Sequence, residues 1–209
     1  YRIKPKDARR QTKTAKTILE RLRSQPGVLL ADEVGMGKTY VSMAVVASVI
    51  LSMRTASCPV VVMAPPGLRK KWQRDWEQFK THCVRDHALD WVRSGYAHTP
   101  TEFFKLLDNK GKQRTQLIFI TTGCFSQGLY DPWVKLGLIR LARRTMRLTD
   151  DQKNRLYRWS ADLVRQFSNT RLTEEVTRRL LDSDVSSWKS ILVEERILKP
   201  FVTAIKSFI

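Results

Sequence analysis

A short glycine-rich loop, residues 32–39 (DEVGMGKT), combines the residue types that bind phosphate groups. Its glycines allow the backbone to turn so that N–H groups point inward, toward an anion. The lysine near its end can reach the β and γ phosphates of a nucleoside triphosphate, and the next hydroxyl can ligate Mg²⁺. We expect the binding residues to be Val34, Gly35, Met36, Gly37, Lys38 and Thr39, with Lys38 and Thr39 catalytic and Thr39 also the metal ligand.

The loop departs from the general pattern G-x-x-x-x-G-K-[ST] at its first position, where Asp32 replaces glycine. That pattern is specific only when a strand precedes it and a helix follows it. The continuous apolar run 28–31 predicts a strand buried on both faces, as in a parallel sheet. Residues 38–53, rich in Ala, Val and Met, predict the helix, whose N-terminus favours an anion.

The segments around this unit alternate between strand and helix patterns. A basic arm at 1–10 precedes a helix at 11–23. Further buried strands are predicted at 59–65 and 116–122, and a short one at 88–92. Two helices lie between them: one has Leu68, Trp72, Trp76 and Phe79 on a single face, and the other begins with the capping box of Thr99 and Glu102. This alternation predicts an α/β fold with a parallel sheet.

Residues 130–209 contain no convincing strand and read as a helical annex to the α/β part, 1–129. A capping box at Thr149 and Gln152 begins one helix. That helix carries Leu156, Trp159, Leu163 and Phe167 at helical spacing, and two more are predicted at 172–181 and 185–197.

The chain is strongly basic, with 38 Lys and Arg against 20 Asp and Glu and a net charge of +18. Such a charge suggests a polyanionic partner, usually nucleic acid. Three widely spaced cysteines fit a reducing, cytoplasmic environment, and neither a secretory signal nor a membrane-spanning stretch is found. We also expect a piece of a longer protein, because the chain begins at Tyr1 and ends within an apolar pattern.

Three segments resemble successive motifs of the Swi/Snf-like group of superfamily 2 helicases: LLADEVGMGKT, VVVMAPPGLRKKWQRDWEQF and LIFITTGCFSQ. The form with Val34 is most similar to bacterial RNA-polymerase-recycling ATPases and related translocases. The second motif differs in order, with Trp72 before Gln73 where the family has Gln-Trp. The resemblance covers residues 8–129, and its first motif is the most specific.

The resemblance implies a RecA-like, three-layer αβα lobe of a P-loop NTPase, with residues 130–209 as a helical insertion. It implies ATP and Mg²⁺ as cofactors, Gln11 as the residue that reads adenine, and movement along double-stranded DNA. Contacts to the nucleic-acid backbone would come from Pro66, Gly67, Leu68, Arg69, Lys70, Thr121 and Thr122.

One family feature is missing, the Asp-Glu-x-His that follows a later strand. The late acidic pairs, Asp150-Asp151 and Glu194-Glu195, lie in helical patterns and do not replace it. We therefore expect a partial first lobe that lacks the second lobe and is inactive alone, although the parent protein would hydrolyse ATP.

Two other functions stay open: an RNA- or DNA-unwinding helicase of another superfamily 2 branch, and a nucleotide-regulated module in which the annex binds DNA. The annex has a basic face of Arg140, Arg143, Arg144 and Arg147 that could contact DNA, a protein or the missing lobe. RNA polymerase, or a phage-defence or DNA-repair complex, is the expected partner, in the cytoplasm or at the nucleoid of a bacterium.

Overall fold

The computed structural model describes residues 4–33, 35–53, 58–126, 131–168 and 172–197, with side chains to residue 165 in the fourth range. The chain divides into two compact units. The first unit contains residues 1–95 and 115–119, and the second contains 96–114 and 120–209. These units do not by themselves test the predicted division at residue 129, which stays a prediction.

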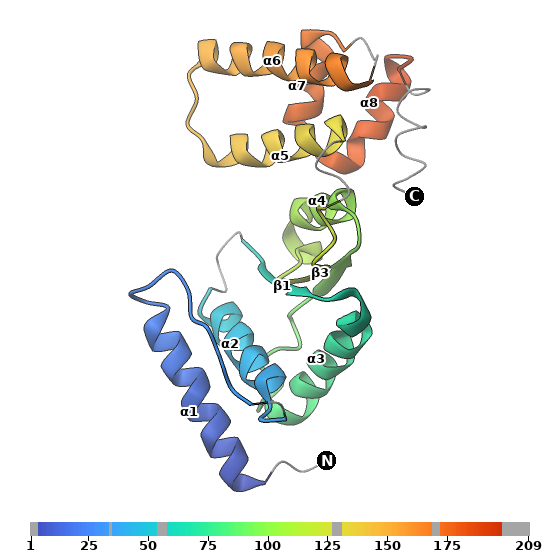
Figure 1. The fold of residues 1–209 in the computed structure, drawn as a ribbon. Helices are drawn as coiled ribbons and strands as arrows, with labels where there is room; N and C mark the ends of the chain where they lie inside the picture. The colour runs from blue at the N-terminus through green and yellow to red at the C-terminus, as the bar shows by residue number, and fades with distance from the viewer. Residues whose placement is uncertain (1–3, 34, 54–57, 127–130, 169–171, 198–209) are drawn as a thin grey trace. The chain divides into compact units, whose positions relative to one another are not determined.

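Three helices build the first unit (Figure 1): α1 (Pro5–Arg21), α2 (Lys38–Ser52) and α3 (Arg69–Cys83). Helix α2 is central, because it packs against α1, α3 and strand β1 (Val60–Ala64). The predicted arm at 1–10 is wrong over its described part, since α1 begins at Pro5, where the fixed φ of proline suits the first helical position. A short 3₁₀ turn, η1 (Pro66–Leu68), precedes α3.

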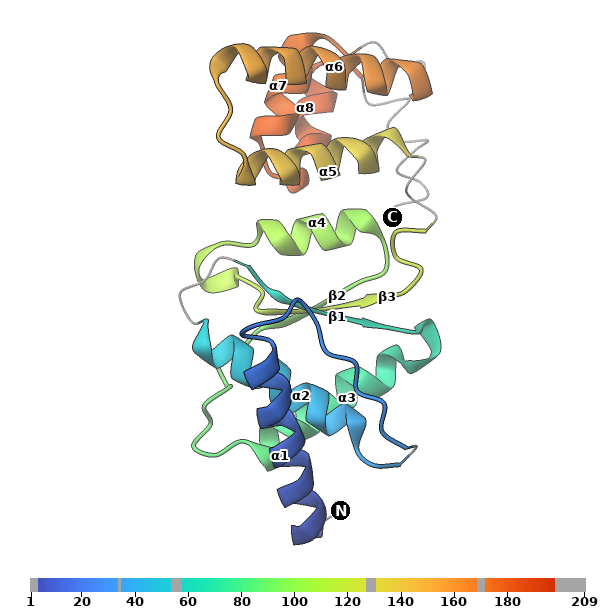
Figure 2. The ribbon, with the colours of Figure 1, turned by 60° about the vertical axis from the view of Figure 1, so that its left-hand side comes forward.

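The sheet is parallel and has the order β1-β3-β2 (Figure 2), with β2 at Ser94–Ala97 and β3 at Leu117–Thr121. The central strand β3 is buried throughout, as its continuous apolar pattern predicts. The strand predicted at 59–65 is confirmed as β1, but it is an edge strand with Met63 56% exposed, so its predicted burial is wrong. The strand predicted at 88–92 is wrong, because residues 88–91 form turns, and strand β2 begins two residues after this segment, at Ser94.

The strand predicted at 28–31 is wrong. The structure assigns these residues to no strand, and Leu29 is 91% exposed. An apolar run indicates a preference for burial, but a strand also requires a neighbour that accepts and donates its backbone hydrogen bonds. The described sheet consists of β1, β3 and β2, and residues 28–31 pair with none of these strands. The described chain is thus mixed α/β with a small parallel sheet, compatible with part of a RecA-like lobe.

Helices build most of the second unit. A cluster of large apolar side chains, including Phe104, Trp133, Tyr157 and Trp188, forms its core. The capping boxes predicted at Thr99 and Thr149 are both confirmed. The elements are α4 (Pro100–Asp108), η2 (Gly111–Gln113), α5 (Pro132–Thr145), α6 (Asp150–Ser168), α7 (Glu174–Asp182), η3 (Val185–Ser187) and α8 (Trp188–Glu194).

Helix α6 confirms the predicted periodicity but not the predicted face. Tyr157, Ala161 and Val164 are buried, whereas Trp159 is 55% exposed. The buried face is displaced by about one residue from the predicted face, which contains Leu156 and Leu163. Both faces carry apolar side chains, so the pattern of apolar residues alone did not distinguish them. Among the described helices, none has the length and apolar character that crossing a membrane requires.

Of the four arginines of the predicted basic face, Arg140 is buried and Arg143 is half-buried, whereas Arg144 and Arg147 are exposed. Arg140 is 4% exposed and pairs with Asp108 at 2.7 Å and with Asp184 at 2.8 Å. Arg144 pairs with the same oxygen of Asp108 at 2.8 Å, and Arg143 pairs with Asp182. These three cations therefore join α5 to α4 and to the end of α7, inside the second unit.

Candidate phosphate-binding site

The loop before α2 has the backbone conformation that only glycine adopts easily. Gly35 has φ 86° and Gly37 has φ 80°, both in the left-handed region. Gly37 also has a steric reason, because a Cβ at this position would collide with the side-chain amide of Gln11. The loop therefore needs glycine at residue 37 for its backbone angle, and a side chain there would displace the amide of Gln11.

Helix α2 offers hydrogen-bond donors at the end of the loop. It begins at Lys38, and its first turn contains no acidic side chain. The first four N–H groups of a helix have no partner within the helix, and the helix dipole adds a partial positive charge there. Lys38 and Thr39 are the first two residues of α2, so amides, ammonium and hydroxyl occur together, and this set fits a triphosphate with its magnesium ion.

The ammonium of Lys38 is bound to the loop itself. Its Nζ donates to the backbone oxygen of Asp32 at 2.6 Å and to that of Glu33 at 2.8 Å. Both acceptors are neutral carbonyls, so a phosphate, which carries full negative charge, can compete with them for the ammonium. The lysine is thus held against the start of the loop by contacts that a ligand can exchange.

Helix α1 contacts the loop through two consecutive residues, Arg10 and Gln11. The side-chain amide of Gln11 lies against Gly37. Arg10 donates to Asp32 Oδ2 at 3.3 Å and to the backbone oxygen of Met36 at 2.6 Å. Arg10 was not predicted from sequence, where the only signals were its position beside Gln11 and the acidic residue that replaces the first loop glycine.

The structure brings together Gln11, Gly35, Met36, Gly37, Lys38 and Thr39 around one loop, while Val34 lies outside the described residues. Their predicted contacts with a nucleotide stay a prediction. Of the residues assigned to nucleic acid, Pro66, Gly67 and Leu68 form η1 and are exposed, and Arg69 and Lys70 begin α3. Thr121 ends β3 and is 8% exposed, so of the two threonines only Thr122 is open to solvent.

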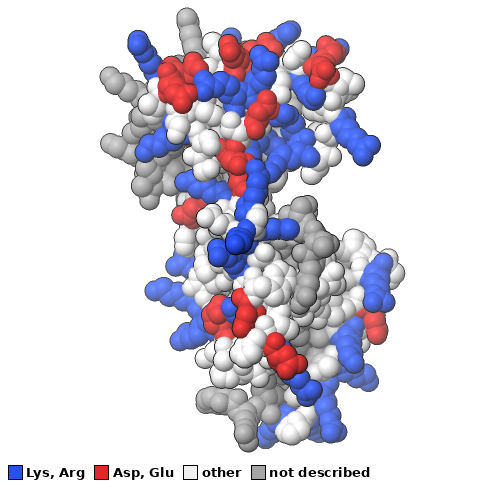
Figure 3. Space-filling model, turned by 180° about the vertical axis from the view of Figure 1, so that it is seen from behind, with Lys and Arg blue, Asp and Glu red and all other residues white. Residues whose placement is uncertain are grey.

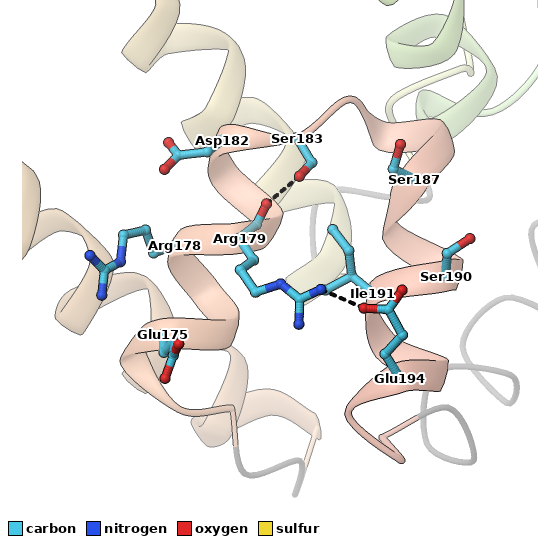
Figure 4. A pocket seen from close by; sticks show the side chains of 9 residues that line it. All are labelled: Glu175, Arg178, Arg179, Asp182, Ser183, Ser187, Ser190, Ile191 and Glu194. Carbon is cyan, nitrogen blue, oxygen red and sulfur yellow. Dashed lines mark hydrogen bonds and ion pairs between the residues drawn. The ribbon is translucent and has the colours of Figure 1, made fainter.

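No acidic pair after residue 149 lies at the end of a strand, and a third pair, Glu174-Glu175, begins α7. Asp150 and Asp151 begin α6 and pair with Lys153 and Arg155 at exposed positions. Glu194 and Glu195 both pair with Arg179, which Figure 4 shows reaching from α7 across a pocket of about 640 Å³ toward α8. The carboxylates of the first and last pairs are thus occupied by ion pairs within the second unit, and the pocket between α7 and α8 has a lining of mixed charge.

Basic side chains are spread over the surface. On the face shown in Figure 3, Lys and Arg outnumber Asp and Glu and are not gathered into one band. Among the described residues, no cluster of three or more His, Cys, Asp or Glu is suited to hold a metal ion.

Comparison with protein families matches the model of the SNF2-related domain to residues 10–136, more than half of the chain. The match begins at Arg10, and it includes the glycine loop and all three strands. Comparison with curated proteins and with solved structures gives no match. At the level of the family, the match indicates a helicase-like ATPase of the SNF2 type, which uses ATP with Mg²⁺. The chain therefore belongs to the SNF2-related domain family.

Proposed function

We propose that this chain is the ATP-binding part of an ATP-dependent translocase that moves along double-stranded DNA, similar to bacterial RNA-polymerase-recycling members of the family. The observation that carries the proposal is the loop itself, where two left-handed glycines bring the start of a helix, an ammonium and a hydroxyl together. RNA polymerase or a defence or repair complex would be the partner of the parent protein.

Each loop residue has a definite task in this proposal. The amides at the start of α2 and the Lys38 ammonium would bind the phosphates, and the Thr39 hydroxyl would ligate Mg²⁺. The magnesium ion, when bound, neutralises charge on the phosphate oxygens. Gln11 would recognise adenine, and its contact with Gly37 supports this because it places a hydrogen-bonding amide beside the loop.

The proposal includes that these 209 residues alone do not hydrolyse ATP. The sequence contains no Asp-Glu-x-His, and none of its three late acidic pairs, which lie in α6, in α7 and at the end of α8, follows a strand. No carboxylate would then orient the attacking water. Phosphate release by the purified chain should equal the background rate, and release above it that disappears in Lys38→Ala would contradict this part.

The DNA track is proposed to include η1 and the start of α3. Pro66, Gly67 and Leu68 are exposed, and the basic residues Arg69 and Lys70 follow at once. Backbone N–H groups and cations at a helix start bind phosphate oxygens without reading base sequence, which suits a protein that moves along DNA. Thr122, which is exposed after β3, would add a small hydroxyl, whereas Thr121 is buried and would not reach DNA in this conformation.

The nucleotide part is tested by measuring ATP affinity for the wild type, Lys38→Ala and a control, Lys16→Ala. Lys16 is an exposed residue of α1, so the control removes the same charge away from the loop. Lys38→Ala should weaken ATP by at least about tenfold, because an ion-assisted contact to phosphate is lost. Equal affinities in all three proteins would contradict the loop assignment.

The DNA part is tested by titrating duplex DNA, single-stranded DNA and RNA at several salt concentrations. Lys70→Ala should reduce the salt slope for duplex by about one, as expected for one lost phosphate contact. The matched control is Lys13→Ala, an exposed lysine of α1. Tighter binding of single strands or RNA than of duplex would instead favour an unwinding helicase.

A further inference from the structure

Arg10 contacts two separate residues of the phosphate loop, Asp32 and Met36. Its Nη1 contacts the carboxylate of Asp32, the first loop residue, and its Nη2 donates to the carbonyl of Met36, next to Gly37. One side chain from α1 thereby bridges residues four positions apart in the loop. A planar guanidinium with several donors in a fixed fork is suited to hold two acceptors at a set separation.

Arg10 differs from the other cations of α1 in its surroundings. Its side chain is 31% exposed and that of Asp32 is 32% exposed, whereas the neighbouring Arg9 is exposed. The Nε of Arg10 is buried and has no hydrogen-bond partner among the described residues. Burying a donor without a partner is unfavourable, so the two contacts of the guanidinium must offset this cost. Arg10 is therefore built into the contact between α1 and the loop.

The next residue in the chain, Gln11, rests against the same loop. Its amide lies against Gly37, one residue after the carbonyl that Arg10 binds. Because the two residues are consecutive in α1, fixing Arg10 on the loop also limits where Gln11 can lie. The position of the Gln11 amide and the separation of Asp32 from Met36 thus depend on the same arginine.

We propose that Arg10 is a positioning residue of the nucleotide site, which sets the shape of the loop and places Gln11 beside it. The inference rests on the proposed ATP-binding function. Its consequence is that loss of Arg10 weakens the binding of the triphosphate and also reduces discrimination between ATP and GTP. A purely structural pair between α1 and the loop would change both affinities by the same factor and leave their ratio unaltered.

The experiment compares the wild type, Arg10→Ala, Arg10→Lys and the control Arg9→Ala. Arg9→Ala removes an identical side chain at the adjacent, exposed position of α1. Two quantities are measured: the affinities for ATP and GTP, and hydrogen exchange of the amides of residues 35–39 without nucleotide. Thermal unfolding of each variant checks that the fold is retained.

Arg10→Ala should weaken ATP by about five- to tenfold, the scale of one net hydrogen bond, and move the ATP to GTP ratio toward one. The loop amides should exchange faster. Arg10→Lys should recover part of the affinity but not the ratio, since an ammonium does not span both acceptors. Adding Arg10→Ala to Gln11→Ala should leave the ratio where Gln11→Ala alone sets it.

ATP binding by the wild type distinguishes failure of the inference about Arg10 from failure of the proposed function. If the wild type binds ATP and Lys38→Ala does not, but Arg10→Ala behaves like Arg9→Ala in ratio and exchange, the inference about Arg10 is overturned while the proposed function stands. If the wild type binds no ATP, the proposed function is overturned and the inference with it.

Discussion

Asp108 in the second unit and Asp32 in the first both accept hydrogen bonds from arginine, but their surroundings differ. Asp108 is 7% exposed, and its two oxygens accept hydrogen bonds from Arg140, Arg144 and the backbone N–H of Val185. The side chain of Asp32 is about a third exposed, and the arginine that it meets, Arg10, also binds a loop carbonyl.

The comparison separates charges that hold a fold together from charges that can exchange partners. Asp108 and Arg140 are both buried, whereas Arg144 is 40% exposed, so removing Arg140 leaves the buried carboxylate of Asp108 with fewer partners away from water. Around the loop the groups are half-exposed, and Lys38 is bound by neutral carbonyls that a phosphate can replace. We therefore expect mutations in the second unit to change stability and mutations at the loop to change binding.

The largest expected effect is at the buried pair. Arg140→Ala should lower the free energy of unfolding by about 2–3 kcal/mol, because Asp108 loses its buried partner while it keeps Arg144 and the N–H of Val185. Denaturant titration measures this loss. The control is Arg155→Ala, whose pair with Asp151 is exposed at both ends and should contribute less than about 1 kcal/mol. A similar small loss for Arg140→Ala would remove the contrast between the two units.

Within the second unit, two tryptophans sharpen the same contrast. Trp188 is 3% exposed and its Nε1 donates to the backbone oxygen of Leu180 at 2.8 Å. Trp188→Phe should cost about 1–3 kcal/mol through lost volume and the lost hydrogen bond. Trp159→Phe, at an exposed position of α6, should change stability by less than about 0.5 kcal/mol. Equal losses in the free energy of unfolding would mean that the burial and hydrogen bond of Trp188 do not stabilise the unit.

The two loop glycines test the first unit. Gly35→Ala and Gly37→Ala both place a side chain at positive φ, at a cost of about 1–2 kcal/mol each. Only Gly37→Ala also displaces Gln11, since a Cβ at residue 35 meets nothing within 4 Å. The two variants should have similar stability, but Gly37→Ala should show the greater loss of ATP over GTP preference in nucleotide titrations. The reverse order would contradict the placement of Gln11.

The smallest expected effect concerns thiol chemistry. Burial raises the pKa of Cys124 to about 11, so its thiol stays protonated and shielded at pH 8. Cys58 and Cys83 are both exposed, but burial raises the pKa of Cys83, so Cys58 should react with iodoacetamide first, as mass spectrometry of the labelled protein can follow. The raised pKa also means that this group lowers stability as pH rises from about 9 to 11, where the unfolded state loses its proton first. Fast native labelling of Cys124 would contradict its burial.

The features predicted correctly from sequence depend on neighbouring residues. The capping boxes at Thr99 and Thr149 were predicted because their hydrogen bonds join groups three residues apart. The glycine loop was predicted for the same reason, since backbone angle and helix start are local properties. The central strand β3 has a continuous apolar run, and its full burial follows from that run.

The features that failed depend on distant partners. Residues 28–31 have the apolar character of a strand, but pairing is a property of the whole sheet. The arginines of α5 looked like a surface because Asp108 lies 32 residues before Arg140 and the main-chain partners lie on α7. Arg10 was missed since its contacts with the loop span more than twenty residues.

The central claim is that the loop at residues 32–39 binds the phosphates of a nucleotide, and the most direct test is a ladder of ligands. Affinity of the wild type is measured for ATP, ADP, AMP and adenosine in the presence of Mg²⁺. The account predicts that affinity falls with each phosphate removed, and that Lys38→Ala flattens the series. Adenosine binding as tightly as ATP, or a series unchanged by Lys38→Ala, would contradict it.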